Sequence, residues 1–200
     1  MEIRPLSIPH AFEVTPKQFP DDRGRFLEAY RSDRLSDALG HEFTLAQANT
    51  SVSRRGVVRG IHFADIPPGQ AKYVMCPRGA VLDFVIDIRV GSPTFGTWDS
   101  VLLDDTERRA IYIAEGLGHA FVALEDDSTV VYLVSAPFNP SAEHGIDPTD
   151  SEVRLDLSGV EQLLLSPKDT DAPTLQQAAE LGILPTWEDS LAFYAELAAR

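Results

Sequence analysis

Between residues 11 and 137 the chain is a series of short apolar runs, each followed by turn residues. The run 81–90 is largely apolar and β-branched and stops at the turn Gly91-Ser92-Pro93, so it predicts a long strand. Comparable runs predict strands at 43–52, 57–63, 71–76, 99–103, 110–113, 120–124 and 129–135.

Many short strands with no helices between them are typical of an antiparallel sandwich or barrel. A fold of alternating strands and helices is disfavoured, because the chain also lacks a Gly-x-Gly-x-x-Gly segment. Helical patterns are peripheral. They predict a short helix capped by Ser32-Asp33 and ending at Gly40, a helix over 175–181 capped by Thr174, and a last helix over 187–200.

We therefore expect one all-β domain over residues 1–200. Its barrel core is expected at about 11–137, and the loop and short helices over 138–200 are expected to pack around it. The 200-residue chain is long enough to bury a core without disulfides or a structural metal.

Composition narrows the possible partners. The net charge of −14 argues against nucleic acid, because phosphate contacts need clustered Lys and Arg. No apolar run is long enough for a transmembrane helix, so no membrane partner is expected. The single cysteine, Cys76, excludes an internal disulfide and a CxxC motif, and it fits a cytoplasmic location.

The distribution of positive charge is unusual. Of the 17 basic residues only Lys17, Lys72 and Lys168 are lysines. An acidic chain repels an anionic ligand on average, so such a ligand would need a local basic pocket.

His62 is the first candidate for chemistry. Alternation along the predicted strand 57–63 puts Arg59 and His62 on opposite faces. A barrel metal site of the cupin type usually needs a His-x-His pair, and the residue two positions after His62 is Ala64. We therefore expect no catalytic metal.

Three further candidates have ordinary structural interpretations when taken singly. Lys72 and Tyr132 lie in apolar strands, where a lysine usually snorkels to an edge and an aromatic packs in the core. Lys168-Asp169 follows a Ser-Pro turn and would by default be solvated. Together with His62 they form a set suited to proton transfer beside a carbonyl group.

Several segments in order resemble the dTDP-4-dehydrorhamnose 3,5-epimerase family. The resemblance covers about residues 3–186 and is most specific in Arg59-Gly60-Ile61-His62 and in the long segment ending at Gly96. The matching segments are 22–28, 47–49, 58–63, 70–73, 87–96, 118–121 and 165–169, with Tyr132 and Glu143.

The resemblance implies a cupin-type antiparallel jelly-roll barrel that epimerises a dTDP-linked 4-keto-6-deoxy sugar without a cofactor. By resemblance, His62 is the base, Asp169 orients it, Tyr132 is the acid on the opposite face and Lys72 lies near the keto oxygen. The positions matching substrate contacts are Arg23, Glu28, Gln47, Asn49, Arg59, His119, Phe138, Glu143 and Lys168.

The resemblance also implies a homodimer with shared active sites, because Arg23 and Glu28 in such enzymes reach across to the partner chain. One departure is Phe138, where the family usually has a tyrosine. Inversion at carbon 3 alone and inversion at carbons 3 and 5 therefore both stay open. Two alternatives also remain: a cupin ketoisomerase acting on the same nucleotide sugar, and a non-catalytic nucleotide-sugar binding module.

Overall fold

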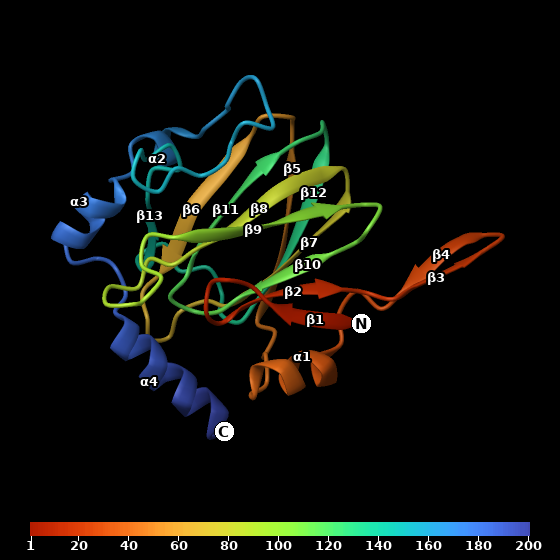
Figure 1. Cartoon of the computed structure of the whole chain (residues 1–200), viewed down its shortest axis with the longest axis horizontal. Helices are drawn as coiled ribbons and strands as arrows, with labels where there is room; N and C mark the ends of the chain where they lie inside the picture. The colour runs from red at the N-terminus through yellow and green to blue at the C-terminus, as the bar shows by residue number, and fades with distance from the viewer.

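Two antiparallel sheets form the body of the protein in the computed structural model, which describes all residues from Met1 to Arg200 (Figure 1). One sheet has the order β1 (Glu2–Pro5), β2 (Ala11–Thr15), β10 (Ala110–Ile113), β7 (Lys72–Arg78), β12 (Ser128–Val134), β5 (Gln47–Ser53). The other has the order β13 (Glu143–Gly145), β6 (Val58–Ala64), β11 (Gly118–Ala123), β8 (Ala80–Ile86), β9 (Trp98–Asp104). This arrangement confirms the prediction of an all-β, antiparallel jelly-roll barrel.

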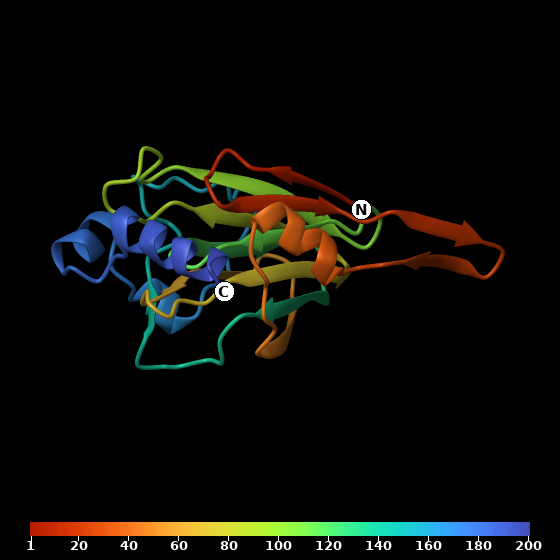
Figure 2. The same ribbon diagram turned by 90° about the horizontal axis from the view of Figure 1, so that it is seen from below.

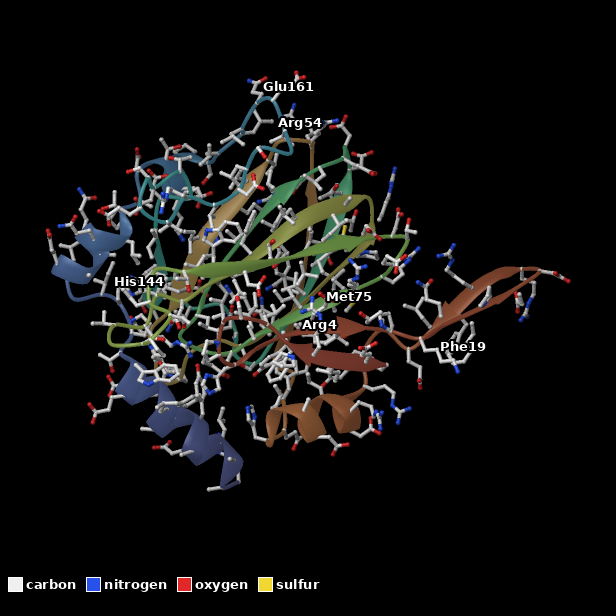
Figure 3. The ribbon with its side chains drawn as sticks, in the orientation of Figure 1. Arg4, Phe19, Arg54, Met75, His144 and Glu161 are labelled. Carbon is white, nitrogen blue, oxygen red and sulfur yellow. The ribbon has the colours of Figure 1, made fainter.

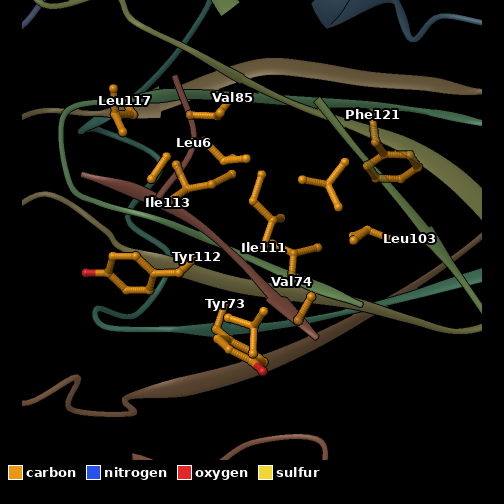
Figure 4. Packing of buried hydrophobic residues seen from close by; sticks show 14 of the residues in the cluster. Leu6, Tyr73, Val74, Val85, Leu103, Ile111, Tyr112, Ile113, Leu117 and Phe121 are labelled. Carbon is orange, nitrogen blue, oxygen red and sulfur yellow. The ribbon is translucent and has the colours of Figure 1, made fainter. Parts of the chain in front are cut away.

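The main hydrophobic cluster fills the space between the two sheets. Val74 and Ile111 contribute to it from one sheet and Val85, Leu103 and Phe121 from the other (Figure 4). A second cluster covers the outer face of the five-stranded sheet and includes residues of the C-terminal segments. Because this sheet is covered on both faces, β8 and β11 are apolar on both faces rather than alternating, apart from Asp83 and His119.

Four short helices lie around the barrel, mainly in the C-terminal part of the chain, as predicted. They are α1 (Ser32–Leu39), α2 (Pro167–Thr170), α3 (Leu175–Glu180) and α4 (Trp187–Ala198). Thr174 caps α3, as predicted, and Gln177 completes a capping box with it. None of the helices is long and apolar enough to cross a membrane.

Some predicted boundaries were wrong. The N-cap of α1 is Arg31 rather than Ser32-Asp33, because Asp33 forms an ion pair with Arg31 instead of capping the helix. The strand predicted at 81–90 ends at Ile86, because the following residues turn so that the amide N–H of Arg89 donates to the Asp87 carboxylate. The apolar pattern did not predict β1, β2, β13, α2 or a hairpin.

That hairpin consists of β3 (Gln18–Asp21) and β4 (Gly24–Leu27), and it projects from one end of the barrel (Figures 1 and 2). Its strands pair only with each other. Phe19 and Phe26 are exposed on it, and Figure 3 shows Phe19 on the hairpin, outside the barrel.

Candidate active site

A cavity of about 260 Å³ opens between the two sheets and receives side chains from both. A neighbouring groove of about 550 Å³ shares Arg59, His62 and Lys168 with it and extends along the segment before α2. The cavity is lined by Ser51, Arg59, His62, Gln70, Lys72, His119, Phe121, Tyr132, Val134, Phe138, Glu143 and Lys168.

His62 lies at the junction of the cavity and the groove, and its ring is held by a buried carboxylate. The Nε2 of His62 is 2.7 Å from Oδ1 of Asp169, whose side chain is only 6% exposed. The Ser166 hydroxyl donates to the other carboxylate oxygen, and Ser166 is also the N-cap of α2. Burial raises the pKa of Asp169, but the hydrogen bonds from His62 and Ser166 outweigh it and leave the pKa below its usual value.

Arg59 and His62 both line the cavity, so the prediction that they face opposite ways was wrong. His62 pairs with His119 across β6 and β11, whereas Arg59 pairs with Phe121. An interval of three residues on β6 thus pairs with an interval of two residues on β11, which is a β-bulge. The bulge turns the side chains of Arg59 and His62 toward the same side of the sheet. Gly60 lies in the bulge at φ +116°, where a Cβ atom would come within 2.4 Å of the His119 carbonyl oxygen.

Lys72 is buried in the wall formed by β7. Its Nζ is 3.5 Å from the carbonyl oxygen of His62, and its side chain reaches into the cavity. Burial lowers the pKa of the Lys72 ammonium, although the negative charges of Glu143 and Asp83 partly oppose this. Lys72 does not snorkel to an edge, which corrects the structural interpretation of this lysine.

Tyr132 comes from β12, on a different wall of the cavity from His62. Its ring packs edge-on against His119 at 6.0 Å between centroids, and its hydroxyl is 3.1 Å from Oγ of Ser51. Burial raises the pKa of the Tyr132 phenol, so it is protonated at neutral pH.

His119 is bound to a second buried carboxylate. Its Nε2 lies 2.9 Å from Oδ2 of Asp83, and both side chains are almost inaccessible to solvent. Burial lowers the pKa of His119 and raises the pKa of Asp83, because both groups are removed from water.

The remaining predicted residues fall into three groups. Arg59, Phe138, Glu143 and Lys168 line the cavity with His62, which gives this acidic chain the local concentration of basic side chains that an anionic ligand requires. Gln47 and Asn49 lie beside it on β5, joined by a 2.6 Å hydrogen bond, and the amide N–H of Phe138 donates to Gln47.

Arg23 and Glu28 are not brought to this cavity within one chain. Arg23 is at the tip of the β3–β4 hairpin, where its side chain is 90% exposed and pairs with Asp21. Glu28 follows the hairpin and pairs with Arg31.

Sequence reasoning missed Ser51, Gln70, Asp83 and Ser166. A usable signal existed for two of them. Ser51 continues the alternation of Gln47 and Asn49 along one strand face, and Asp83 is a lone acid within an apolar run. Ser166 and Gln70 came from segments quoted only for their resemblance.

No group of three or more His, Cys, Asp and Glu side chains lies close enough together to hold a metal ion. The side chains of His62, Tyr132 and Lys72 line the cavity and are of the types that transfer protons or stabilise negative charge.

The chain as a whole is similar to proteins of one family. The sequence model of the family described as dTDP-4-dehydrorhamnose 3,5-epimerase matches residues 5–177. The dTDP-4-dehydrorhamnose 3,5-epimerase of Mycolicibacterium smegmatis is 56% identical over 98% of this chain and 97% of its own length. The dTDP-4-dehydrorhamnose 3-epimerase of Streptomyces niveus is 54% identical over 94% of this chain and 90% of its own.

Solved structures agree with these relatives. The epimerase of Mycobacterium tuberculosis superposes with a TM-score of 0.95 at 48% identity, covering 98% of this chain and all of that chain. The 3′-monoepimerase ChmJ of Streptomyces bikiniensis, solved in complex with dTDP-quinovose, has a TM-score of 0.95 at 44% identity and covers 98% of this chain and 99% of that chain.

Proposed function

This chain belongs to the dTDP-4-dehydrorhamnose 3,5-epimerase family, and from that premise we propose that it inverts carbon 3 of a dTDP-linked 4-keto-6-deoxyhexose. One observation carries the proposal: a carboxylate-bound histidine and a protonated tyrosine reach one cavity from different walls. Inversion needs this arrangement, because the proton must leave one face of the sugar ring and return to the other.

His62 removes the proton from carbon 3, which the neighbouring ketone makes acidic. With Asp169 ionised, the Nε2–H of His62 donates to it, and Nδ1 keeps the lone pair that takes the proton. Asp169 also stabilises the imidazolium that forms. A positioned base of this kind contributes about 10²–10⁴-fold to the rate.

Lys72 stabilises the negative charge that develops on the keto oxygen of the enolate. Its burial makes this charge interaction strong, because little water screens it. A single donor in such a role contributes about 3–4 kcal/mol.

Tyr132 returns a proton to the opposite face of carbon 3. Its raised pKa keeps the phenol protonated until the enolate forms. Phe138, at the cavity mouth, has no hydroxyl to offer the sugar. We therefore propose inversion at carbon 3. A second inversion, at carbon 5, would be detected by the entry of deuterium at that carbon.

The nucleoside diphosphate part of the substrate binds along the groove that continues from the cavity. Arg59 and Lys168 line both spaces and supply positive charge at their junction. Positive charge at this junction suits a ligand in which a diphosphate joins the sugar to the nucleoside.

We also propose that the enzyme is a homodimer in which Arg23 and Glu28 complete the partner's site. The projecting hairpin that carries Arg23 supports this, since none of its residues lines the cavity that holds His62 in the same chain. Mixing an Arg23→Ala chain with a His62→Ala chain should restore activity in about a quarter of the sites if each site draws on two chains. No recovery in a verified mixed dimer would contradict the shared site.

The reaction itself is tested in D₂O with the 4-keto sugar nucleotide. The wild-type enzyme should introduce deuterium at carbon 3 and invert that centre. His62→Ala should lose both reactions, whereas Tyr132→Phe should keep exchange and lose inversion, because His62 can still return a proton to the same face.

Two outcomes would contradict the proposal. A product with its ketone at carbon 3 would indicate a ketoisomerase, and binding without exchange or turnover would indicate a non-catalytic binding module. The cytoplasmic location expected from the single cysteine stays a prediction.

A further inference from the structure

The tyrosine proposed as the acid has one hydrogen-bonding partner, and that partner has no other. Oγ of Ser51 lies 3.1 Å from the Tyr132 hydroxyl, and no other side chain or backbone group hydrogen-bonds to either oxygen. Ser51 also lines the cavity. The Ser51 hydroxyl therefore makes no hydrogen bond within the protein other than the one to Tyr132.

The strand register explains how the two hydroxyls meet. Asn49 lies directly opposite Tyr132 across β5 and β12, and Ser51 lies opposite Val130. Ser51 and Tyr132 are therefore diagonal neighbours on the face that looks into the barrel. The intervening Thr50 points to the other face and is exposed.

The tyrosine ring and its proton are held by different groups. His119 and Phe121 pack against the ring, at 6.0 and 6.4 Å between centroids, and so fix its plane. Neither of them bonds to the hydroxyl, so the direction of the O–H is left to Ser51.

On the basis of the proposed function, we infer that Ser51 is a positioning residue for Tyr132: it donates to the phenol oxygen, directs the phenol proton toward the sugar and stabilises the phenolate left behind. When Ser51 is the donor, the Tyr132 hydroxyl is the acceptor, so its own O–H does not take part in this hydrogen bond and can point into the cavity. When Tyr132 gives its proton to carbon 3, the bond from Ser51 becomes a charge-assisted one.

The burial of the phenol makes this donor necessary. Tyr132 is partly buried in the cavity wall, and a phenolate that forms there without a hydrogen bond is disfavoured. Burial raises the pKa of Tyr132, and the hydrogen bond from Ser51 acts in the opposite direction. The donor lowers the barrier of the second proton transfer and has no part in the first.

The test measures deuterium exchange and inversion at carbon 3 in the same sample. In Ser51→Ala, kcat for inversion should fall by about 10-fold to 100-fold, the value of one hydrogen bond to a charged oxygen. Exchange through His62, the KM and the melting temperature should stay unchanged. Ser51→Thr, which keeps the hydroxyl, should restore inversion, and Thr50→Ala, on the exposed face, serves as the control.

The two single variants separate this inference from the proposed function, and their combination adds a further check. If Tyr132→Phe leaves exchange and inversion at their wild-type ratio, Tyr132 is not the acid and both ideas fail together. If Tyr132→Phe separates the two rates but Ser51→Ala lowers them equally, only the role of Ser51 fails. A loss of inversion from Ser51→Ala that is as large in the Tyr132→Phe background would also overturn it.

Discussion

Asp83 and Asp87 lie close together along one segment of the chain and are both fully buried, yet their surroundings are opposite. The Asp87 carboxylate accepts from Nε and Nη2 of Arg89, at 2.8 and 2.7 Å, and from the hydroxyls of Ser92 and Thr94, both at 2.6 Å. Asp83 accepts only from His119. Burial raises both pKa values, but around Asp87 the hydrogen bonds outweigh it and the pKa is lowered, whereas the pKa of Asp83 stays raised.

The Asp87 side of this comparison is a structural cluster. Arg89 also donates to the carbonyl oxygen of Pro9, bonds to His10 and the Tyr194 hydroxyl, and lies 4.6 Å from the Trp187 ring centroid. It thereby joins the loop before β2 to α4. We call Asp87, Arg89, Ser92, Thr94 and His10 the Arg89 cluster.

The difference shows what remains available for chemistry. Every donor of Arg89 is used within the protein, so the Arg89 cluster has nothing to offer a ligand. Around the cavity, Lys72, His62 and Tyr132 are incompletely bonded and face open space. The segment 87–96 supplied much of the resemblance, but it builds the scaffold and contributes no residue to the cavity.

The largest expected effect is on stability, from Arg89→Met. Removing one partner of a buried ion pair leaves the Asp87 charge uncompensated and should cost about 3–5 kcal/mol of unfolding free energy. Activity per folded molecule should be retained, because Arg89 does not line the cavity. Urea unfolding followed by turnover measured below the transition checks both.

The matched control is Arg78→Met. Arg78 is 71% exposed and pairs weakly with Asp127, so its loss should change stability by no more than about 0.5 kcal/mol. Equal destabilisation by the two substitutions would contradict the role given to the Arg89 cluster.

Lys72→Met tests the other side of the comparison. Met has a similar length, and removing a desolvated ammonium relieves a burial cost, so the unfolding free energy should stay the same or rise. Turnover should fall by about 10²–10³-fold through loss of enolate stabilisation. A destabilised but active enzyme would mean that Lys72 belongs with the scaffold.

The smallest effect is the pH dependence of the two aspartates. The pKa of Asp87 is lower in the folded state, so its contribution to stability is complete above the unfolded pKa, about 3.9, and is lost as the pH falls through the folded pKa. The deficit of Asp87→Asn should therefore shrink on acidification.

The pKa shift of Asp83 has the opposite sign to that of Asp87. Its folded pKa is raised, so its ionised form is destabilising and that cost disappears as the pH falls through the folded pKa. Asp83→Asn should gain stability over wild type at neutral pH and lose that advantage in acid. Unfolding curves at several pH values measure both variants, and parallel pH dependences would refute the distinction.

Local sequence patterns predicted much of the scaffold. The strand at 110–113 has the bounds of β10, and Thr174 caps α3. Apolar runs mark buried strands and Ser or Thr marks a helix start through interactions within a few residues. The end of β8 was missed because the bond between Asp87 and Arg89 redirects the chain, and nothing in the apolar pattern signals it.

Local sequence patterns predicted less of the site than of the scaffold. His62, Lys72, Tyr132 and Asp169 came together in the sequence analysis through the resemblance, since each has an ordinary interpretation alone. Ser51 and Asp83 were missed, although strand alternation and a lone acid in an apolar run pointed to them.

The sequence by itself therefore determined the all-β class, the approximate positions of most barrel strands and the supply of acid, base and basic groups, because these depend on local periodicity and residue type. Only the tertiary structure decided that Arg59 and His62 share a cavity, that Ser51 meets Tyr132, and that Arg23 stays outside the cavity of its own chain. A bulge in β6 depends on its pairing with β11, and a diagonal contact depends on the register of β5 against β12. Strand pairing joins residues distant in the chain, so no local pattern contains that information.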